Sequence, residues 1–161
     1  KSISFKTGME HVIIRPPLVY GYDAPGNFQV ILNCIRKNVP LPFKRINTIR
    51  SFVHVDNLID LILVCLHHPG ASNQLFLVSD DEDIPLSLFL NKIYRYSGSR
   101  LRLLPFPISI LRFFSNLLGR RSSFDKLNNC LTVDITYTKT RLNWNPKITV
   151  DEGIRRCFIQ N

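Results

Sequence analysis

The sequence predicts an α/β protein with a mostly parallel sheet, and three observations support this. Short β-type apolar runs alternate along the chain with segments of helical periodicity, an order that typically builds parallel sheets covered by helices. Of the 161 residues, 45% are hydrophobic and 20% are charged, as in folded domains. No internal repeat and no linker rich in glycine and serine divides the chain, so its length suits one domain.

The first predicted strand covers residues 11–15, an apolar run that ends at Pro16-Pro17. Proline fixes its own backbone angle and lacks an N–H, so a loop is expected after the strand. A helix over residues 27–37 comes next, because apolar side chains recur there at the spacing of one helix face: Phe28, Ile31, Leu32 and Ile35.

The next predicted elements are an extended piece at 40–43, a strand at 51–55 and a helix that includes the apolar residues 58–66. Asp56 is placed to cap the start of this helix, since a carboxylate there accepts hydrogen bonds from free backbone N–H groups. The helix is apolar nearly all round, which predicts that other structure covers it completely.

The second half of the chain continues the alternation. A strand is expected at residues 74–78, followed by the acidic turn 79–83. A helix over 86–97 ends at Gly98, the residue type that most often follows a helix. The remaining predicted elements are, in order, a strand at 101–104, a helix at 108–118, an extended piece at 131–133, a helix at 136–142, and a last helix that starts at Thr149, with Glu152 completing a capping box.

The charge balance favours an anionic partner. The chain has 21 Lys and Arg against 12 Asp and Glu, a net charge of +9. A phosphorylated small molecule, nucleic acid and a membrane surface all fit this surplus. The four cysteines are far apart and form no metal-binding pattern with histidines, so reduced thiols in a cytoplasmic protein are expected.

The predicted strands are too few for a self-sufficient parallel sheet. Only about four are convincing, whereas such a sheet needs several buried strands with helices on both faces. The first strand is also not followed by the glycine-rich turn that holds a nucleotide's phosphates. The sequence therefore has the character of the second half of a protein.

Five motifs occur in order along nearly the whole chain. They are Arg15-Pro-Pro-Leu-Val-Tyr-Gly21, Pro25-Gly-Asn-Phe28, Leu41-Pro-Phe43, Arg50-Ser-Phe-Val-His-Val-Asp-Asn-Leu58, and the late set Val133-Asp134, Leu142-Asn-Trp144-Asn-Pro146 and Thr149-Val-Asp-Glu-Gly153. Together they resemble the extended short-chain dehydrogenase/reductase family, in its nucleotide-sugar epimerase and dehydratase branch. The first motif is similar in form to that of bacterial UDP-glucose 4-epimerases of surface-polysaccharide synthesis.

The resemblance implies that residues 1–161 are the C-terminal half of a Rossmann-type enzyme: the last elements of the parallel sheet plus a small α/β substrate-binding subdomain. The intact enzyme would be a cytoplasmic, homodimeric, NAD-dependent isomerase acting on UDP-glucose or UDP-N-acetylglucosamine. Two motifs of the family have no counterpart in this sequence. One is the glycine-rich turn that binds the cofactor, and the other is the catalytic Ser or Thr with the Tyr-x-x-x-Lys pair. We therefore expect the N-terminal dinucleotide-binding half to be absent, no catalytic residue to be present, and the chain alone to be inactive.

Arg50 is the strongest single site candidate. By the resemblance it contacts the diphosphate of the UDP group. A guanidinium suits this task because its planar fork binds two phosphate oxygens and stays charged. The alternative is a surface arginine at the end of a strand.

Four further residues match positions at which the family contacts its substrate. Leu41 and Phe43 match the pair that packs around the uracil ring, where a flat aromatic face offers stacking. Asn27 and Phe28 match positions that meet the phosphates at a helix start, where free N–H groups favour anions. The alternatives are a core phenylalanine and an N-cap asparagine.

Four more residues complete the candidates for contacts with the cofactor or the substrate. Pro16 and Pro17 match the loop that lines the nicotinamide end of NAD. Leu18 is a substrate-contacting position at which many family members carry Asn, which leaves the sugar open. Lys126 lies where the family completes its diphosphate and ribose contacts, and a solvated surface lysine is its alternative.

Two other interpretations stay open. A dehydratase or a reductase on the same scaffold would carry the same motifs. A non-catalytic module that binds a nucleotide or a membrane surface is a different class, since residues 92–126 hold eight Lys or Arg against one acid and 108–118 has an apolar face with a basic end. No motif of the DNA- and RNA-binding modules occurs, and no histidine spacing predicts a metal site.

Overall fold

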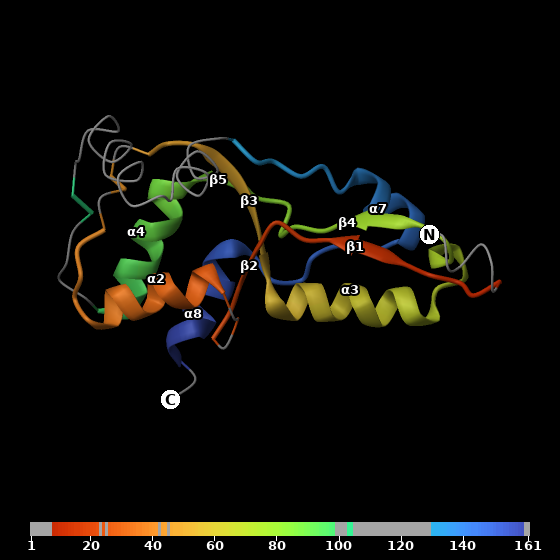
Figure 1. Cartoon of the computed structure of the whole chain (residues 1–161), viewed down its shortest axis with the longest axis horizontal. Coiled ribbons are helices and arrows are strands. Elements are labelled where there is room, and N and C mark those ends of the chain that lie inside the picture. Colours follow the sequence, from red (N-terminus) through yellow and green to blue (C-terminus); the bar gives the residue numbers. More distant parts are fainter. Residues whose placement is uncertain are drawn as a thin grey trace.

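A computed structural model of the chain describes residues 8–22, 24, 26–41, 43–44, 46–98, 103–104 and 130–159. Figure 1 shows two packed regions, one on each side of the long strand β3. The elements are β1 (Ile13–Arg15), β2 (Leu18–Tyr20), α2 (Asn27–Arg36), β3 (Ile49–His54), α3 (Val55–His67), the 3-10 turn η1 (Pro69–Ala71), β4 (Leu75–Leu77), β5 (Asp83–Pro85), α4 (Leu86–Ser97), α7 (Thr136–Leu142) and α8 (Val150–Ile159).

The described strands form two small sheets. β1 pairs in parallel with β4, with Ile14 opposite Phe76. β2 pairs in parallel with β3, and β3 pairs antiparallel with β5. Two of the three pairings are parallel, so the expected α/β class with mostly parallel pairing is confirmed.

Two of these strands were not expected from the sequence. β2 lies where a loop was expected after Pro16-Pro17, and β5 ends the segment expected to be only an acidic turn. Both strands have three residues, and each forms on β3, with Leu18 opposite Phe52 and Asp83 opposite Ser51. The Ser51 hydroxyl also donates to the Asp83 carboxylate. Such short strands are determined by their partner rather than by their own sequence.

The residue that caps the start of α3 differs from the one expected. α3 begins at Val55, so Asp56 lies inside its first turn and is not the cap. His54 takes that role, because its Nδ1 accepts a hydrogen bond from the Asp56 N–H at 3.2 Å. The helix therefore starts directly where β3 ends.

The expectation that other structure covers this helix completely is wrong for the described chain. α3 buries Asn57, Leu61 and Cys65 on one side. Its opposite side exposes four large aliphatic residues: Ile59 (48%), Ile62 (40%), Leu63 (52%) and Leu66 (70%).

The strand β3 separates two apolar cores, because alternate side chains of a strand point to opposite faces. Phe52 lies in the first core, whose largest members are Tyr20, Phe28, Phe52 and Phe89. Val53 lies in the second core, together with Leu61, Phe76 and Trp144. In the first core the rings of Phe52 and Phe89 stack with centroids 3.9 Å apart. The molecule is thus built as two packed halves that share one strand.

The other predicted helices are confirmed where the structure describes them. α4 ends at Gly98, whose φ of 65° is the left-handed conformation that glycine adopts readily. α8 begins one residue after Thr149, whose hydroxyl accepts the Glu152 N–H at 3.3 Å. The Glu152 carboxylate pairs instead with Arg155 and Arg156, so only half of the capping box forms.

The remaining expectations fall partly outside the described residues. The expected helix 108–118 lies outside them, as does half of the expected strand 101–104. The Leu104 N–H donates to the Leu41 carbonyl at 3.0 Å, so the described end of that segment runs beside residue 41. Among the described helices, none combines the length and apolarity that crossing a membrane requires.

Candidate functional site

Arg50 is the second residue of β3, where three segments meet. It lies opposite Ile84 of β5 on one edge and bridges to Leu131 on the other. Its side chain is on the same face of the strand as Phe52, two residues on. The residue is only 8% exposed, and this burial lowers the pKa of its guanidinium. Arginine still remains charged at neutral pH, so the fold holds a positive charge beside the first core.

The candidate apolar residues gather around that same core. Phe28 and Leu41 are buried in it, and Leu18 and Phe43 pack against it partly exposed. The ring of Phe28 meets Tyr20 edge to face, with centroids 5.8 Å apart, and is 1% exposed. Of these side chains, Leu18 and Phe43 therefore have surface left for a ligand.

The start of α2 offers backbone rather than side-chain contacts. Gly26, with a φ of 94°, is the N-cap, so Asn27 is the first helical residue rather than the cap. Among the described residues no side chain caps the helix, so none of them competes with an anion for the N–H groups of its first turn. Because its side chain is buried, Phe28 offers an anion at this helix start only its backbone N–H.

The segment from residue 41 to 48 is held in place by backbone hydrogen bonds. The Leu41 carbonyl accepts from Leu104 N–H, and the first N–H groups of α4 donate to Ile46 and Thr48 carbonyls at 3.3 and 3.0 Å. The position of Phe43 beside the first core is therefore fixed from both sides of the segment.

Pro16 and Pro17 lie between β1 and β2, at the carboxyl end of β1. Pro16 is exposed and Pro17 is partly exposed. Ligands of parallel α/β folds bind at the carboxyl ends of the strands. These two residues therefore fit a loop that lines a cofactor, whereas Lys126 lies outside the described residues.

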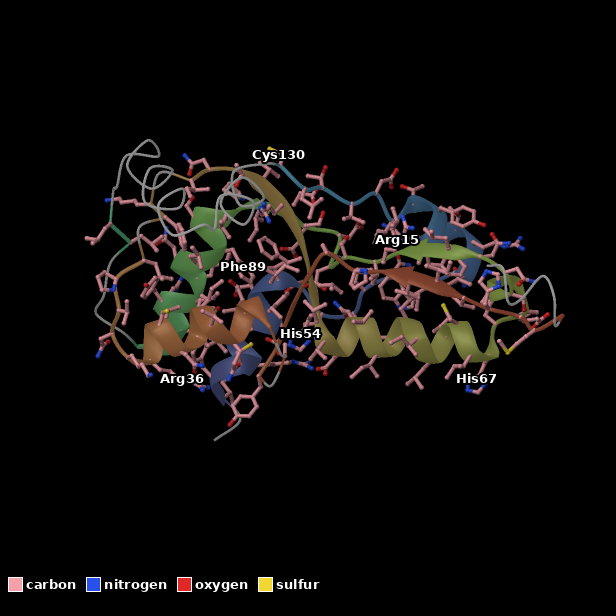
Figure 2. The ribbon with its side chains drawn as sticks, in the orientation of Figure 1. Arg15, Arg36, His54, His67, Phe89 and Cys130 are labelled. Atoms are coloured by element: carbon pink, nitrogen blue, oxygen red, sulfur yellow. The ribbon has the colours of Figure 1, made fainter. Side chains whose placement is uncertain are left out.

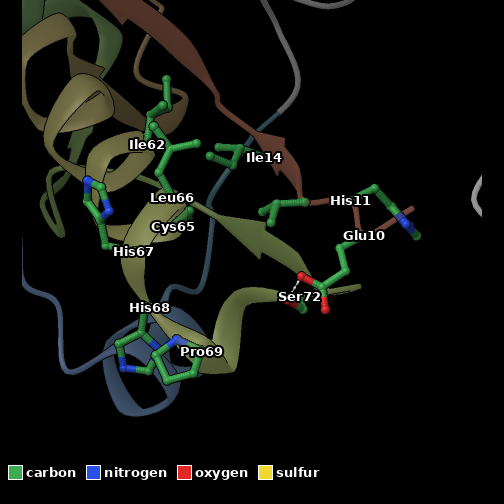
Figure 3. Close-up of a pocket in the computed structure, with 11 residues that line it drawn as sticks. Glu10, His11, Ile14, Ile62, Cys65, Leu66, His67, His68, Pro69 and Ser72 are labelled. Carbon is green, nitrogen blue, oxygen red and sulfur yellow. Dashed lines mark hydrogen bonds between the residues drawn. The ribbon is translucent and has the colours of Figure 1, made fainter. Parts of the chain in front are cut away.

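Two cavities of the described chain lie elsewhere. One, of about 500 Å³, lies between β1 and the C-terminal part of α3 (Figure 3). The other, of about 420 Å³, flanks the same end of α3 near Leu63 and Val64. Neither is lined by the candidate residues. The described residues also contain no group of three His, Cys, Asp or Glu that could hold a metal ion.

A buried polar network that sequence analysis missed centres on Asp80. Its carboxylate accepts hydrogen bonds from the Tyr20 hydroxyl at 2.7 Å, from the Asn57 amide at 2.7 Å, and from the His54 N–H at 2.9 and 3.1 Å. Asp80 is 4% exposed, and burial raises its pKa to about 6 against the effect of these donors. Burial, followed by the charge of Asp80, raises the pKa of Tyr20 in turn.

Asn57 extends this network to the C-terminal part of the chain. Its Nδ2 also donates to the Ile148 carbonyl at 2.8 Å, and its Oδ1 accepts the N–H groups of Lys147 and Ile148 at 3.1 Å. Figure 2 shows His54 at the junction of β3 and α3. The network thus joins the ends of β2 and β3, the start of α3 and the segment that leads into α8.

The backbone of Gly153 in α8 lies close to this network. A Cβ at this position would lie 2.5 Å from the Tyr20 hydroxyl and 2.8 Å from His54 Cδ2. The absence of a side chain therefore allows α8 to pack against Tyr20 and His54. The only sequence signal for this network was that Tyr20, the pair His54 and Asn57, and Gly153 belong to three of the motifs. Asp80 belongs to none of them.

Comparison with known proteins agrees with this fold. No family model matches the chain. It is 39% identical over 158 residues to the UDP-glucose 4-epimerase of Vibrio cholerae, a match that covers 96% of this chain and 48% of that protein. The chain corresponds to part of an extended short-chain dehydrogenase/reductase of the epimerase branch.

Solved structures of epimerases share its fold. The UDP-glucose 4-epimerase of Thermotoga maritima with UDP-glucose superposes with a TM-score of 0.73, covering 98% of this chain and 47% of that one at 16% identity. The UDP-glucuronic acid 4-epimerase of Bacillus cereus in complex with NAD gives 0.71 over 98% and 45%, at 15% identity. The chain spans about half the length of these epimerases, and its small parallel sheets are part of a Rossmann-type fold.

Proposed function

We propose that this chain is the nucleotide-sugar-binding portion of an NAD-dependent epimerase of UDP-glucose or UDP-N-acetylglucosamine. The observation that carries the proposal is the 39% identity to the Vibrio cholerae UDP-glucose 4-epimerase over 158 residues. The buried positive charge of Arg50 supports it, because Arg50 shares a face of β3 with Phe52 of the first core, against which the partly exposed Leu18 and Phe43 pack. A cation and apolar surface in one place suit a diphosphate joined to a flat base.

Each candidate residue then has a role in binding. Arg50 holds the diphosphate, assisted by Lys126 and by the backbone N–H groups of Asn27 and Phe28. Leu41 and Phe43 pack around the uracil ring, with the exposed part of Phe43 as the stacking surface. Leu18 borders the sugar. In this proposal the contribution of the chain is to orient the nucleotide sugar, which lowers the entropic cost of the reaction.

The chemistry belongs to another part of the enzyme. No Tyr-x-x-x-Lys motif occurs among the 161 residues. We infer that an N-terminal half carries the catalytic pair and most of the NAD site, with Pro16 and Pro17 lining its nicotinamide end. NAD, when bound, supplies the hydride acceptor. The intact enzyme is then a cytoplasmic homodimer of surface-polysaccharide synthesis, and the chain alone binds substrate without converting it.

The test is calorimetric titration of the purified chain with UDP. We expect saturable binding at micromolar concentrations. Arg50→Ala should weaken it about tenfold or more, since a charge-assisted hydrogen bond contributes about 1.5–3 kcal/mol. Arg50→Lys should recover only part of the loss, because an ammonium lacks the planar fork.

The matched control is Arg36→Ala, which removes an exposed arginine at the far end of α2 (Figure 2). It removes the same charge from the chain without touching β3, so its UDP affinity should equal that of the wild type. Absence of UDP binding, or equal effects of the two substitutions, would contradict the proposal. Interconversion of UDP-glucose by the chain alone would contradict its non-catalytic role.

A further inference from the structure

Ser51 lies in β3 directly after Arg50 and forms hydrogen bonds to segments on both edges of the strand. Its hydroxyl donates to the carboxylate of Asp83 in β5 and accepts the N–H of Val133 at 2.8 Å. A serine hydroxyl has one proton to donate and two lone pairs that accept. Ser51 is 1% exposed, so its side chain joins β5 and the segment 131–133 from inside the protein.

The same two segments flank the backbone of Arg50. Ile84 of β5 lies opposite Arg50 on one edge of β3, and Leu131 lies opposite it on the other. Figure 1 shows the described chain starting again at residue 130 beside β3. Burial lowers the pKa of the Arg50 guanidinium, and a charge on Cys130 acts in the opposite direction, so Cys130 lies near this group.

The part of the segment 131–133 beside Arg50 has little apolar burial to hold it in place. Leu131 is 49% exposed, and Thr132 is exposed. The Leu131 carbonyl accepts the Ser51 N–H at 2.9 Å, and the Leu131 N–H donates to the Ile49 carbonyl at 3.2 Å. At this point of the segment, the backbone hydrogen bonds and the Ser51 hydroxyl therefore contribute more than apolar packing.

The carboxylate of Asp83 fixes the direction of the Ser51 hydroxyl. Asp83 lies directly opposite Ser51 in the β3–β5 pair, and side chains in this relation point to the same face of the sheet. Because the carboxylate accepts the single hydroxyl proton, a lone pair of Oγ is left for the Val133 N–H. A hydrogen bond to a charged group is also stronger than a neutral one, and bonds in a chain strengthen each other.

We propose that Ser51 and Asp83 are positioning residues for Arg50: their hydrogen bonds hold both segments that flank it, and so keep its guanidinium where the diphosphate of a nucleotide sugar binds. This inference rests on the proposed function. A side chain already held in its bound position loses less conformational freedom when the ligand binds. Because alternate side chains of a strand point to opposite faces, Ser51 does not contact the ligand and acts through the backbone.

The first test measures UDP affinity by calorimetric titration in a double-mutant cycle. Ser51→Ala removes the hydroxyl and should weaken UDP binding about threefold to tenfold, the range of one hydrogen bond. In the Arg50→Ala background the same substitution should change the affinity by less than about twofold, because the residue through which it acts is gone. Equal effects in the two backgrounds would give Ser51 a general structural role and overturn the inference.

Asp83→Asn and Asp83→Ala separate the hydrogen bond from the charge. Both remove the negative charge, but only asparagine keeps an oxygen that accepts the Ser51 proton. We expect Asp83→Asn to keep at least the UDP affinity of the wild type, and Asp83→Ala to lose about as much as Ser51→Ala. Asp83 is exposed, so neither variant endangers the fold. Equal affinities of the two variants would show that Asp83 does not position Arg50.

The second test needs no ligand. The Leu131 N–H donates to the Ile49 carbonyl, so its hydrogen exchange reports whether the segment stays on β3. We expect Ser51→Ala to speed this exchange about threefold or more. Thr138→Val is the matched control, because Thr138 of α7 is likewise 1% exposed and its hydroxyl donates to the Leu77 carbonyl of β4. It should change neither this exchange nor the UDP affinity.

The outcomes separate this inference from the proposed function. A chain that binds UDP through Arg50 but is unaffected by Ser51→Ala refutes the positioning role alone. A chain that does not bind UDP refutes the proposed function, and with it the positioning of Arg50 for a diphosphate. Leu131 exchange that Ser51→Ala leaves unchanged, or that Thr138→Val speeds equally, refutes the role of the Ser51 hydroxyl whatever the result with UDP.

Discussion

The Tyr20 hydroxyl donates a 2.7 Å hydrogen bond to the carboxylate of Asp80, inside the protein and between residues 60 positions apart. Tyr20 belongs to the first core, while Asp80 follows Val78 of the second core. The bond therefore joins the two packed halves across β3. Asn57 and His54 donate further hydrogen bonds to the same carboxylate, and Gly153 lies against Tyr20 and His54.

Tyr20→Phe removes the hydroxyl and leaves the ring in place. Asp80 then loses one donor without a cavity being formed, so the free energy of unfolding should fall by about 1–3 kcal/mol. Urea unfolding followed by the fluorescence of Trp144, the single tryptophan, measures the change. Tyr96→Phe removes a similar bond to Asp151, which is half-exposed, and should have a smaller effect. If the two variants lost equal free energy of unfolding, burial would add nothing to the hydrogen bond of Tyr20, and the prediction would be wrong.

Asp80 should make stability depend on pH in a direction unusual for a carboxylate. Its pKa rises from 3.8 to about 6 in the fold, so the folded state binds the proton more tightly than the unfolded state. The stabilisation is complete below pH 4 and is lost as the pH rises through 6. Over this interval it amounts to about 3 kcal/mol.

The measurement for Asp80 is the difference in unfolding free energy between the wild type and Asp80→Asn at pH 4, 5, 6 and 7. Subtraction cancels the titration of groups that both proteins share, including His54, whose pKa is lowered by burial. The wild type should lose stability relative to the variant between pH 4 and 6. A difference that does not change with pH would show that Asp80 titrates normally.

Asn57→Ala should release the C-terminal segment. The Asn57 side chain makes four hydrogen bonds, and its removal leaves the carboxylate of Asp80 and the backbone of Lys147 and Ile148 without them. We expect a loss of about 3 kcal/mol or more and faster amide exchange at Lys147 and Ile148. Asn47→Ala removes one bond far from this segment, which exposed Asn47 accepts from the Ser87 hydroxyl, and should leave that exchange unchanged.

Gly153→Ala should destabilise the protein although alanine favours helices by about 1 kcal/mol over glycine. The new Cβ would lie 2.5 Å from the Tyr20 hydroxyl, so α8 has to move outward. Combining it with Tyr20→Phe removes the closest contact. The double variant should therefore be more stable than the sum of the single effects predicts, which thermal unfolding of all four proteins measures. Additive effects would contradict the contact.

The sequence predicted the longer helices well and the short strands poorly. α4 and α7 lie at their expected bounds because periodicity and Gly98 act within each segment. β2 and β5 were missed because three residues carry too little pattern, and their pairing with β3 decides them. For α3, the apolar sequence was recognised, but its burial depends on a layer that the described chain does not supply.

The candidate site shows the same division. The motif around Arg50 indicated which residue to examine, and the structure showed that this residue is only 8% exposed, on the same face of β3 as Phe52 of the first core. The role of Asp80 was hidden in a segment that resembled a polar turn. A turn aspartate and a buried one have the same local sequence, and only partners 23 to 60 residues away distinguish them.

The sequence by itself determined the α/β class, the positions of the main helices and the order of motifs that relate the chain to epimerases. These properties depend on interactions within a few residues or on residue identity. Only the tertiary structure decided which apolar face of α3 stays exposed, that His54 rather than Asp56 caps this helix, and that Tyr20, Asn57 and Asp80 form one network. Those features depend on contacts between segments far apart in the sequence, and local sequence patterns do not predict the energies of such contacts.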